Sequence, residues 1–321
     1  MKRIFMMALI MIAIQFAKAQ TSNITGTVKD DKGNALQHVF ISDDQYKTAS
    51  FSDSTGNFTI AVHPDSKLKF SLAGYDAASV AIDKNNTSPQ VALKSNGTGG
   101  GANTITAQAT AQKNGNEAES TYGSGGVITP VHQKGNTHGN RYLFDTFVQG
   151  YIISANGELI HGAIDMYDYD KMDGSLLLSN DNKTMSQISW DNVKSFSLFS
   201  RQNERYDFEK APGIDPSHYV QVLASGLKYK IYKLIKTRFV KSDYVNTGVA
   251  SRGNDYDEFI DDADYYIFDV QANQPKKISL KKKSLKDAFA KDADKVNKYL
   301  SDNSGDINDA YLAKLGDFMN Q

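Results

Sequence analysis

One stretch in the last third of the chain gathers carboxylates that could do chemistry. It contains Asp255, Asp257, Glu258, Asp261, Asp262 and Asp264, with no lysine or arginine between them. Carboxylate oxygens are the ligands that Ca²⁺ takes in proteins, and paired carboxylates serve many glycosidases as acid and base. A run of charge is also typical of a solvated loop. We therefore predict a solvated acidic loop, with Asp255, Asp257, Glu258, Asp261 and Asp262 as candidate calcium ligands.

A second acidic group precedes Gly174 and resembles a calcium-binding loop. Asp168 and Asp170 have the spacing of the first two ligands of an EF-hand. An EF-hand loop also needs a glycine at its sixth position and a glutamate at its twelfth. Here Asp173 comes one residue late, and Ser179 occupies the position of the glutamate. The spacing excludes an EF-hand.

The other reactive residue types lack the spacing that catalysis or metal binding requires. The six histidines form no His-x-His or His-Glu-x-x-His pattern, and only His132 and His138 make a loose pair. Ser124 lies between glycines but does not match the Gly-x-Ser-x-Gly elbow of hydrolases. The chain has no cysteine, which excludes thiol catalysis and disulfides. We therefore predict no catalytic residue and no cofactor, and no metal ligands beyond the acidic candidates.

A basic cluster follows the acidic stretch and consists of Lys276, Lys277, Lys281, Lys282, Lys283 and Lys286. Cations at the N-terminus of a helix oppose its dipole, so the cluster needs a reason. Three explanations remain open: an exposed strand edge on which lysines deter pairing, ion pairs with the acidic stretch, or contact with an anionic partner such as a lipopolysaccharide phosphate. For the anionic partner the candidates are Lys281, Lys282 and Lys283.

The composition sets the size and class of the elements that must position these residues. A chain of 321 residues suggests about two domains. Its 16 Phe and 17 Tyr supply enough apolar surface for two cores and favour β-strands. Lysine and arginine number 36 against 37 acids, for a net charge of −1. This balance gives no overall attraction to nucleic acid or to an anionic membrane. We expect no nucleic-acid partner, and a peripheral association with the envelope stays open.

The first residues predict export. Lys2 and Arg3 precede the apolar stretch 4–16, which is too short to span a bilayer, and Ala17-Lys18-Ala19 follows as a small-residue cleavage pattern. We therefore expect residues 1–19 to be a signal peptide and the mature chain to begin at Gln20. No later segment has transmembrane length.

Residues 20–94 have the pattern of a small β-sandwich. The predicted strands are 24–28, 38–41, a run ending at 51–52, 58–62, 67–72 and 78–82. Turn residues separate them at 30–34 and 53–57. Val39, Ile41, Phe58 and Ile60 alternate with polar residues, so they should face one core. Gly56 should take a positive φ in its turn.

These residues resemble the signature of the carboxypeptidase regulatory-like domain over about residues 22–84. The matching residues, in order, are Gly26-x-Val28, Asp31-x-Gly33-x-Ala35-Leu36, Val39-x-Ile41, Asp53-x-x-Gly56-x-Phe58-x-Ile60 and Phe70-x-x-x-Gly74-Tyr75. The resemblance implies a seven-stranded, transthyretin-like sandwich that accompanies other domains, including peptidases and outer-membrane transporters. It implies an accessory module rather than a catalytic one.

The composition changes after Lys94. Residues 95–136 are rich in Gly, Asn, Thr, Gln and Ala and contain few apolar residues before Val127. Such a segment cannot bury enough surface to offset its ordering entropy. We predict a flexible linker between two domains.

Residues 137–321 predict a β-rich domain that ends in helices. Asn156-Gly157 between apolar runs predicts a hairpin, and 265–270 should pair with 275–280. Further strands are expected at 174–179, 185–188, 193–199, 219–224, 227–234 and 235–240. Two amphipathic helices are expected at 284–301 and 306–320, the first capped by Ser284 with Asp287 and the second by Asp306 with Asp309.

The predicted fold class is therefore mainly β: an N-terminal seven-stranded β-sandwich, then a β-rich (α+β) domain with two short C-terminal helices. The second domain resembles an uncharacterised class of bacterial envelope proteins at Gly150–Gly162 and Lys276–Asn320, with no activity to transfer. The interpretation that follows is a non-enzymatic exported protein that binds or scaffolds other envelope proteins. The alternative is a periplasmic hydrolase of peptide or glycan with the sandwich as accessory domain. The helical C-terminus favours the periplasm over the cell surface.

Overall fold

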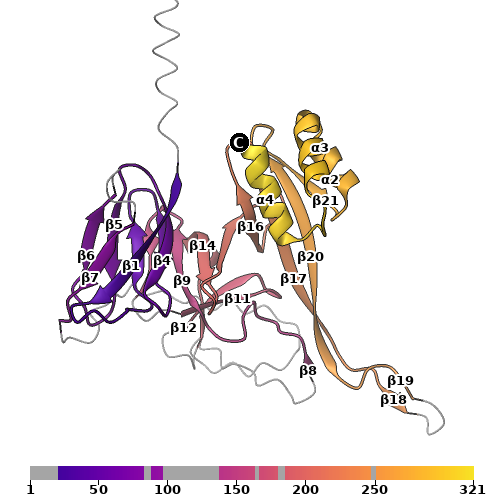
Figure 1. Cartoon of the computed structure of the whole chain (residues 1–321). Helices are drawn as coiled ribbons and strands as arrows, with labels where there is room; N and C mark the ends of the chain where they lie inside the picture. Colours follow the sequence, from indigo (N-terminus) through magenta and orange to yellow (C-terminus); the bar gives the residue numbers. More distant parts are fainter. Residues whose placement is uncertain (1–20, 83–87, 97–136, 163–165, 180–184, 247–250) are drawn as a thin grey trace, which may run out of the picture. The chain divides into compact units, whose positions relative to one another are not determined.

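The computed structural model describes residues 21–82, 88–96, 137–162, 166–179, 185–246 and 251–321 (Figure 1). The predicted signal peptide and nearly all of the predicted linker lie outside these residues. The described residues divide into two compact units. The first contains those up to Asn96 together with Gly162, and the second contains the remainder. The fold is mainly β, as the sequence predicts.

The first unit is a β-sandwich of two antiparallel-rich sheets that enclose one core. One sheet has the order β4-β1-β7 and the other the order β3-β2-β5-β6. Their bounds are β1 (Ser22–Asp30), β2 (Phe40–Asp43), β3 (Thr48–Phe51), β4 (Asn57–Val62), β5 (Lys67–Ser71), β6 (Ala78–Ala81) and β7 (Gln90–Leu93). Seven described strands thus form the two layers that the sequence predicts.

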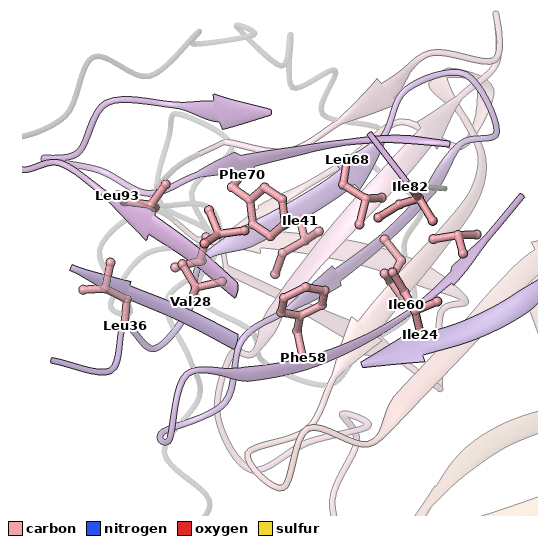
Figure 2. Close-up of a cluster of buried hydrophobic side chains, with 13 residues drawn as sticks. Ile24, Val28, Leu36, Ile41, Phe58, Ile60, Leu68, Phe70, Ile82 and Leu93 are labelled. Carbon is pink, nitrogen blue, oxygen red and sulfur yellow. The ribbon is translucent and has the colours of Figure 1, made fainter. Parts of the chain in front are cut away.

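Alternation within the strands places the predicted residues in the core. Val39, directly before β2, and Ile41, within β2, are fully buried, and Phe58 and Ile60 reach the same cluster from β4. Figure 2 shows Ile41, Phe58 and Ile60 pointing into one apolar cluster between the strands. Phe70 of β5 meets Phe58 edge-on, with ring centroids 5.5 Å apart. The sandwich is therefore held by side chains from both sheets, and no cysteine is needed.

The turn before β4 depends on Asp53 and Gly56. Oδ1 of Asp53 accepts hydrogen bonds from the backbone N–H of Thr55 at 2.8 Å and of Asn57 at 3.0 Å. Gly56 has a φ of 77°, and a Cβ at this position would lie 2.4 Å from the carbonyl oxygen of Val28. The predicted positive φ is confirmed, and the close approach to β1 is a second reason for glycine.

The second unit is built on one long sheet. Its order is β10-β9-β14-β15-β16-β17-β20-β21, and β8 also pairs with β20. The bounds are β8 (Thr137–His138), β9 (Gln149–Ser154), β10 (Leu159–Ile160), β14 (Val193–Phe199), β15 (Arg205–Lys210), β16 (Tyr219–Ser225), β17 (Tyr229–Val240), β20 (Asp257–Asp269) and β21 (Gln274–Ile278). The hairpin predicted at Asn156-Gly157 joins β9 to β10, and the one predicted near residue 272 joins β20 to β21. The two strands expected at 227–234 and 235–240 are one strand, β17.

Two short sheets complete the second unit. The first contains β11 (Met166–Asp170), β12 (Ser175–Ser179) and β13 (Ser186–Gln187), in that order. The second contains β18 (Val245–Asn246) and β19 (Ser251–Arg252), which extend the β17–β20 hairpin at its far end (Figure 1). Strands β11 and β15 were not expected from the sequence.

The acidic stretch is a strand, and the prediction of a solvated loop at 255–264 is wrong for most of it. β20 runs antiparallel to β17 from Glu258 to Asp269 without a break in register. Asp262 lies opposite Lys236, and Asp261 lies opposite Thr237. Oppositely charged and hydrogen-bonding pairs across strands stabilise a sheet, so the charge run is compatible with a strand once its partner strand supplies cations.

The C-terminal segment forms three α-helices instead of two. They are α2 (Lys282–Ala288), α3 (Ala293–Asp302) and α4 (Asp309–Asn320), with a 3₁₀ turn at Ala290–Asp292 between the first two. The break follows Phe289, whose φ of −98° and ψ of 30° end α2. Phe289 is fully buried and meets Tyr229 of β17 edge-on, with centroids 4.8 Å apart. Packing of this ring against the sheet therefore overrides a continuous helix.

The predicted helix caps are also wrong. α2 begins two residues before Ser284, so Ser284 lies inside the helix, and its Oγ accepts a hydrogen bond from the backbone N–H of Ser279 at 3.0 Å. Asn308 caps α4, because its Oδ1 accepts from the N–H of Tyr311 at 2.9 Å. The apolar residues predicted for these helices do reach the core, and Val296, Leu300 and Leu315 are buried.

Asn320 attaches α4 to the start of β17. Its Oδ1 accepts hydrogen bonds from the backbone N–H groups of Lys228 and Tyr229, both at 3.0 Å. Its Nδ2 donates to the carbonyl oxygens of Tyr229 at 2.9 Å and Gly316 at 2.8 Å. One side chain therefore satisfies four backbone groups at the junction of helix and sheet.

We expect Asn320→Ala to lower the free energy of unfolding of the second unit by about 2–3 kcal/mol, because partly buried backbone groups lose their partners. Trp190 is the only tryptophan and lies in this unit, so its fluorescence during urea unfolding reports the change. The exposed neighbour Gln321 provides a control, and Gln321→Ala should change the value by less than about 0.5 kcal/mol. Equal effects of the two substitutions would contradict the role of Asn320.

Candidate functional site

The predicted calcium ligands do not converge. Successive side chains of a strand point to opposite faces, so Asp257 and Asp261 of β20 lie on one face and Glu258 and Asp262 on the other. Asp255 precedes the strand. Within the described ranges, no group of three or more histidine or acidic side chains is placed to hold a metal ion.

Several of these carboxylates instead have partners within the protein. Asp261 accepts from Lys171 Nζ at 2.6 Å and from the hydroxyl of Thr237. Asp262 lies 3.4 Å from Arg238, with both side chains largely exposed. Asp264 pairs with Lys277 of β21 at 2.7 Å. Asp261, Asp262 and Asp264 therefore have cations of the protein as partners. Of the lysine cluster, Lys277 takes part in this pairing, as one of the three explanations predicts for the cluster.

Lys171 is the centre of this arrangement. It is 6% exposed and lies in the turn between β11 and β12. Its ammonium group reaches Asp261 of β20, and its carbonyl oxygen accepts from the N–H of Thr237 in β17 at 3.2 Å. Its own N–H donates to the carbonyl oxygen of Arg141 at 3.1 Å. Lys171 thus connects the β11–β12 hairpin to both strands of the β17–β20 hairpin.

The aspartates beside Lys171 form a second, more buried group. Arg141 Nε donates to Asp170 at 2.7 Å, and its Nη2 pairs with Asp173. Asp168 lies two residues earlier on the same face of β11 and is 3% exposed. Its Oδ1 accepts from the backbone N–H of Tyr169 at 2.7 Å and of Phe144 at 3.2 Å. These residues hold the segment before β9 against β11.

Burial dominates the ionisation of Asp168. Removal from water disfavours its charged form and raises its pKa to about 8, although hydrogen bonds from Tyr169 and Phe144 oppose this shift. Burial also raises the pKa of Asp170, while Arg141 acts in the other direction. A carboxyl group that is neutral near pH 7 can serve as an acid in catalysis. Here its contacts are to backbone groups of its own unit.

Asp215, Ser217 and His218 are the residue types of a hydrolase triad. Ser217 Oγ is 3.0 Å and Asp215 Oδ1 is 3.1 Å from the same ring nitrogen of His218, Nδ1. A triad places the nucleophile and the acid on different nitrogens of the imidazole. The other nitrogen, Nε2, is buried, and no hydrogen-bond partner lies within the described part of the chain. This geometry does not let the aspartate hold one ring nitrogen while the other nitrogen accepts the serine proton.

Asp215 organises a turn. Its Oδ1 accepts from the N–H of Ser217 at 2.9 Å and of His218 at 2.8 Å, and its Oδ2 pairs with Lys236 of β17 at 2.5 Å. Burial alone would raise the pKa of Asp215, but the hydrogen bonds from Lys236, Ser217 and His218 outweigh it and hold the pKa below its ordinary value. The carboxylate therefore anchors the loop before β16 to β17.

The lysines predicted to meet an anionic partner lie at the start of α2. Lys281 precedes the helix, and Lys282 and Lys283 occupy its first turn, so the explanation that they belong to a strand edge is wrong. All three are exposed. Lys282 Nζ donates to the carbonyl oxygen of Leu300 at the end of α3, at 3.1 Å. An anionic partner for these residues stays a prediction.

The sequence did not reveal the contacts that Lys171, Asp168 and Asp215 make. Lys171 meets Asp261, which is 90 positions later in the chain. No local motif marks such a pair, because the pairing depends on how the strands assemble. The one usable signal was Asp168 and Asp170 in a stretch of aromatic residues that alternates at period two.

Comparisons with known proteins identify no family. No protein-family model matches the chain, and no curated protein matches it. Among solved structures, a streptococcal ancillary pilin is 10% identical with a TM-score of 0.19, over 60% of this chain and 59% of that chain. BcpA, the major pilin subunit of Bacillus cereus, is 10% identical with a TM-score of 0.19, over 81% of this chain and 93% of that chain. TM-scores at this level do not establish a common fold.

None of the helices in the described ranges has the length and apolar character that a membrane-spanning helix requires. The three C-terminal helices are short, and their buried residues pack on the sheet of the second unit. The described residues thus form two mainly β units, and several of their charged side chains make internal ion pairs.

We expect Asp168→Asn to change stability in a pH-dependent way. The native state raises the pKa of Asp168 from 3.8 to about 8, so the protonated form is stabilising below pH 4 and that contribution is lost as the pH rises to 8. The free energy of unfolding of the variant, relative to that of the wild type, should therefore rise by roughly 2–5 kcal/mol between pH 4 and pH 8.5. Urea unfolding followed by Trp190 fluorescence measures the difference. Asn140→Ser changes a neutral side chain nearby, and its effect should not vary with pH. A pH-independent effect of Asp168→Asn would contradict the assignment.

Proposed function

We propose that this chain is an exported, non-enzymatic protein of a bacterial cell envelope that binds or scaffolds other proteins. Export is supported by the basic, apolar and small-residue pattern of residues 1–19. The balanced charge supports protein partners over nucleic acid. A non-enzymatic role is supported by the internal contacts of Asp261, Asp215 and Asp168, which use these carboxylates to join elements of the fold.

The observation that carries the proposal is the far part of the β17–β20 hairpin. Beyond Lys236 the two strands continue past β16 and β21 to β18 and β19 (Figure 1). Phe239 and Phe259 face each other there with ring centroids 4.9 Å apart, and both are only partly buried. We call this part of the hairpin, beyond Lys236, the ribbon. Tyr244 is 47% exposed near its end.

Contact with a partner protein would stabilise a two-stranded ribbon of this kind. Two-stranded hairpins are marginally stable in water without further packing. Apolar side chains left partly exposed on them would be stabilised by burial against another protein, since apolar surface is costly in water. The described strand β8 covers only two residues of β20. We therefore assign the contact with a partner to this ribbon.

We infer that the first unit is a carboxypeptidase regulatory-like module in an accessory role. Support comes from the seven strands in two sheets and from the Asp53-to-Phe58 turn, whose hydrogen bonds match the role expected of these residues. A periplasmic location, and not the cell surface, is part of the same proposal. The hydrolase alternative receives no supporting geometry from the described residues, because Asp257 and Glu258 lie on opposite faces of β20 and Asp261 pairs with Lys171.

Site-specific photo-crosslinking tests the proposal. A photoreactive phenylalanine replaces Tyr244 at the far end of the ribbon, or Leu227 in the turn between β16 and β17 as a control. Leu227 is 85% exposed, so both positions are accessible. In intact envelopes we expect Tyr244 to crosslink to one specific protein that Leu227 does not reach. Absence of a specific product at Tyr244, or the same products at both positions, would contradict the proposal.

A further inference from the structure

One edge of β20 is open in the middle of the strand. β17 covers one side of β20 from Glu258 to Asp269. On the other side, β21 pairs antiparallel with Tyr265–Asp269, and β8 pairs parallel with Asp257 and Glu258. Between these two strands, no strand of the described part of the chain pairs with residues 259–264 on this side. Gly139, which follows β8, lies against the carbonyl group of Phe259, so the open part is residues 260–264, or about 17 Å of extended chain.

The direction of the backbone groups at this edge follows from two independent contacts. Facing residues of an antiparallel pair either exchange hydrogen bonds or both point away from each other. Thr237 faces Asp261, but its N–H donates to Lys171 on the opposite side of β17. The N–H and C=O of Asp261 therefore point away from β17, into the gap.

Pro275 of β21 gives the same orientation for the backbone groups of Asp261. It faces Phe268, and because proline has no N–H, the pairs that exchange hydrogen bonds with β21 are those of Ile267 and Asp269. The period of two then directs the N–H and C=O of Ala263 and Asp261 toward the gap. The carbonyl of Phe259 also lies on this side, since a Cβ at Gly139 would approach its oxygen to 2.2 Å.

The side chains at the gap are exposed and acidic. Asp261, Asp262 and Ala263 are the exposed residues of β20. Asp262 and Asp264 share one face of the strand, and each already has an exposed cation as partner: Asp262 lies 3.4 Å from Arg238, and Asp264 lies 2.7 Å from Lys277. Surface pairs of this kind contribute little and leave the carboxylate available to a second cation. The edge therefore favours a cationic neighbour.

We propose that this edge of β20 binds an extended segment of a partner protein as an added β-strand. The segment carries Lys or Arg at alternate positions, on the face of Asp262 and Asp264. Its backbone pairs with Asp261 and Ala263, and such pairing supplies affinity while alternate side chains supply specificity. The inference rests on the proposed binding function and names the chemistry of the partner.

A second copy of this chain fits the edge poorly. Antiparallel self-pairing joins residues whose backbone groups have the same orientation, both into the gap or both away from it, so it would place Asp261 opposite Asp261 or Asp262 opposite Asp262 of the other copy. Like charges that face each other across strands are destabilising. Acidic side chains on an open edge also deter uncontrolled pairing. The same charges that oppose self-association thus select a basic strand.

Binding of a synthetic strand to the full chain without residues 1–19 tests the proposal. The probe is a fluorescent ten-residue peptide of alternating lysine and valine, and its matched control has glutamate in place of lysine. Fluorescence anisotropy measures affinity. We expect the lysine peptide alone to bind, and hydrogen exchange to slow at the amides of Asp261 and Ala263 when it does.

Three variants separate strand addition from general attraction. Ala263→Pro removes an N–H that points into the gap and no bond to β17, and it should weaken the lysine peptide about tenfold. Asp262→Lys should weaken it to a similar degree. Asp306→Lys makes the same charge change at an exposed residue before α4, and it should leave the affinity within about twofold. Circular dichroism checks that each variant is folded.

Several results would reject strand addition at the edge of β20. Absence of binding by the lysine peptide, equal binding by Ala263→Pro, or protection of other amides each rejects strand addition at this edge. Dimerisation through the gap, detected as a dimer that Ala263→Pro abolishes, also rejects it. If Tyr244 crosslinks to the same protein in wild type and in Ala263→Pro, the binding function stands and only the strand addition fails. If Tyr244 gives no specific crosslink, the binding function itself fails.

Discussion

A buried lysine needs a carboxylate, and in the second unit this requirement joins the β11–β12 hairpin to the β17–β20 hairpin. Lys171 enters from the β11–β12 turn, and Asp261 enters from β20. An ammonium group without a partner at such a site would cost several kcal/mol, more than most single contacts in a protein contribute. The pair therefore fixes where the long hairpin lies relative to β11, and the backbone bond from Thr237 to Lys171 fixes its register.

The rest of the unit follows from that position. With β17 held by Lys171, the pairing of Lys236 with Asp215 brings the loop before β16 onto the same strand. On the near part of the hairpin, the residues of β17 and β20 that face the helices form one apolar cluster with α2, α3 and α4. Among the described residues, no such cluster covers the far part, which leaves an open edge and a partly exposed ribbon. The division between a packed and an unpacked half of one hairpin is the structural basis for the proposed binding function.

The sequence was most informative where one pattern decided the structure. The sandwich strands, the turn at Gly56 and the hairpins at Asn156-Gly157 and Ala272–Gln274 followed from period-two alternation and turn residues. It was least informative where tertiary contacts override local preference. Asp257–Asp264 has the composition of a loop, yet cations on β17 and β21 and Lys171 make it a strand. Burial of Phe289 divides a helix that the apolar periodicity predicts as continuous. The contacts of Lys171 with Asp261 and of Asp215 with Lys236 could not be predicted, because these partners come close only after the sheet has formed.

A double-mutant cycle on Lys171 and Asp261 tests the central claim most directly, with unfolding free energies measured by Trp190 fluorescence in urea. Asp261→Asn leaves a buried ammonium group without its counter-charge and should cost about 2–4 kcal/mol. Lys171→Met leaves a carboxylate that is 48% exposed to water and should cost less. The double variant should resemble Lys171→Met, with a coupling energy above about 1 kcal/mol. If both single changes cost less than about 0.5 kcal/mol and add independently, the pair does not position the hairpin.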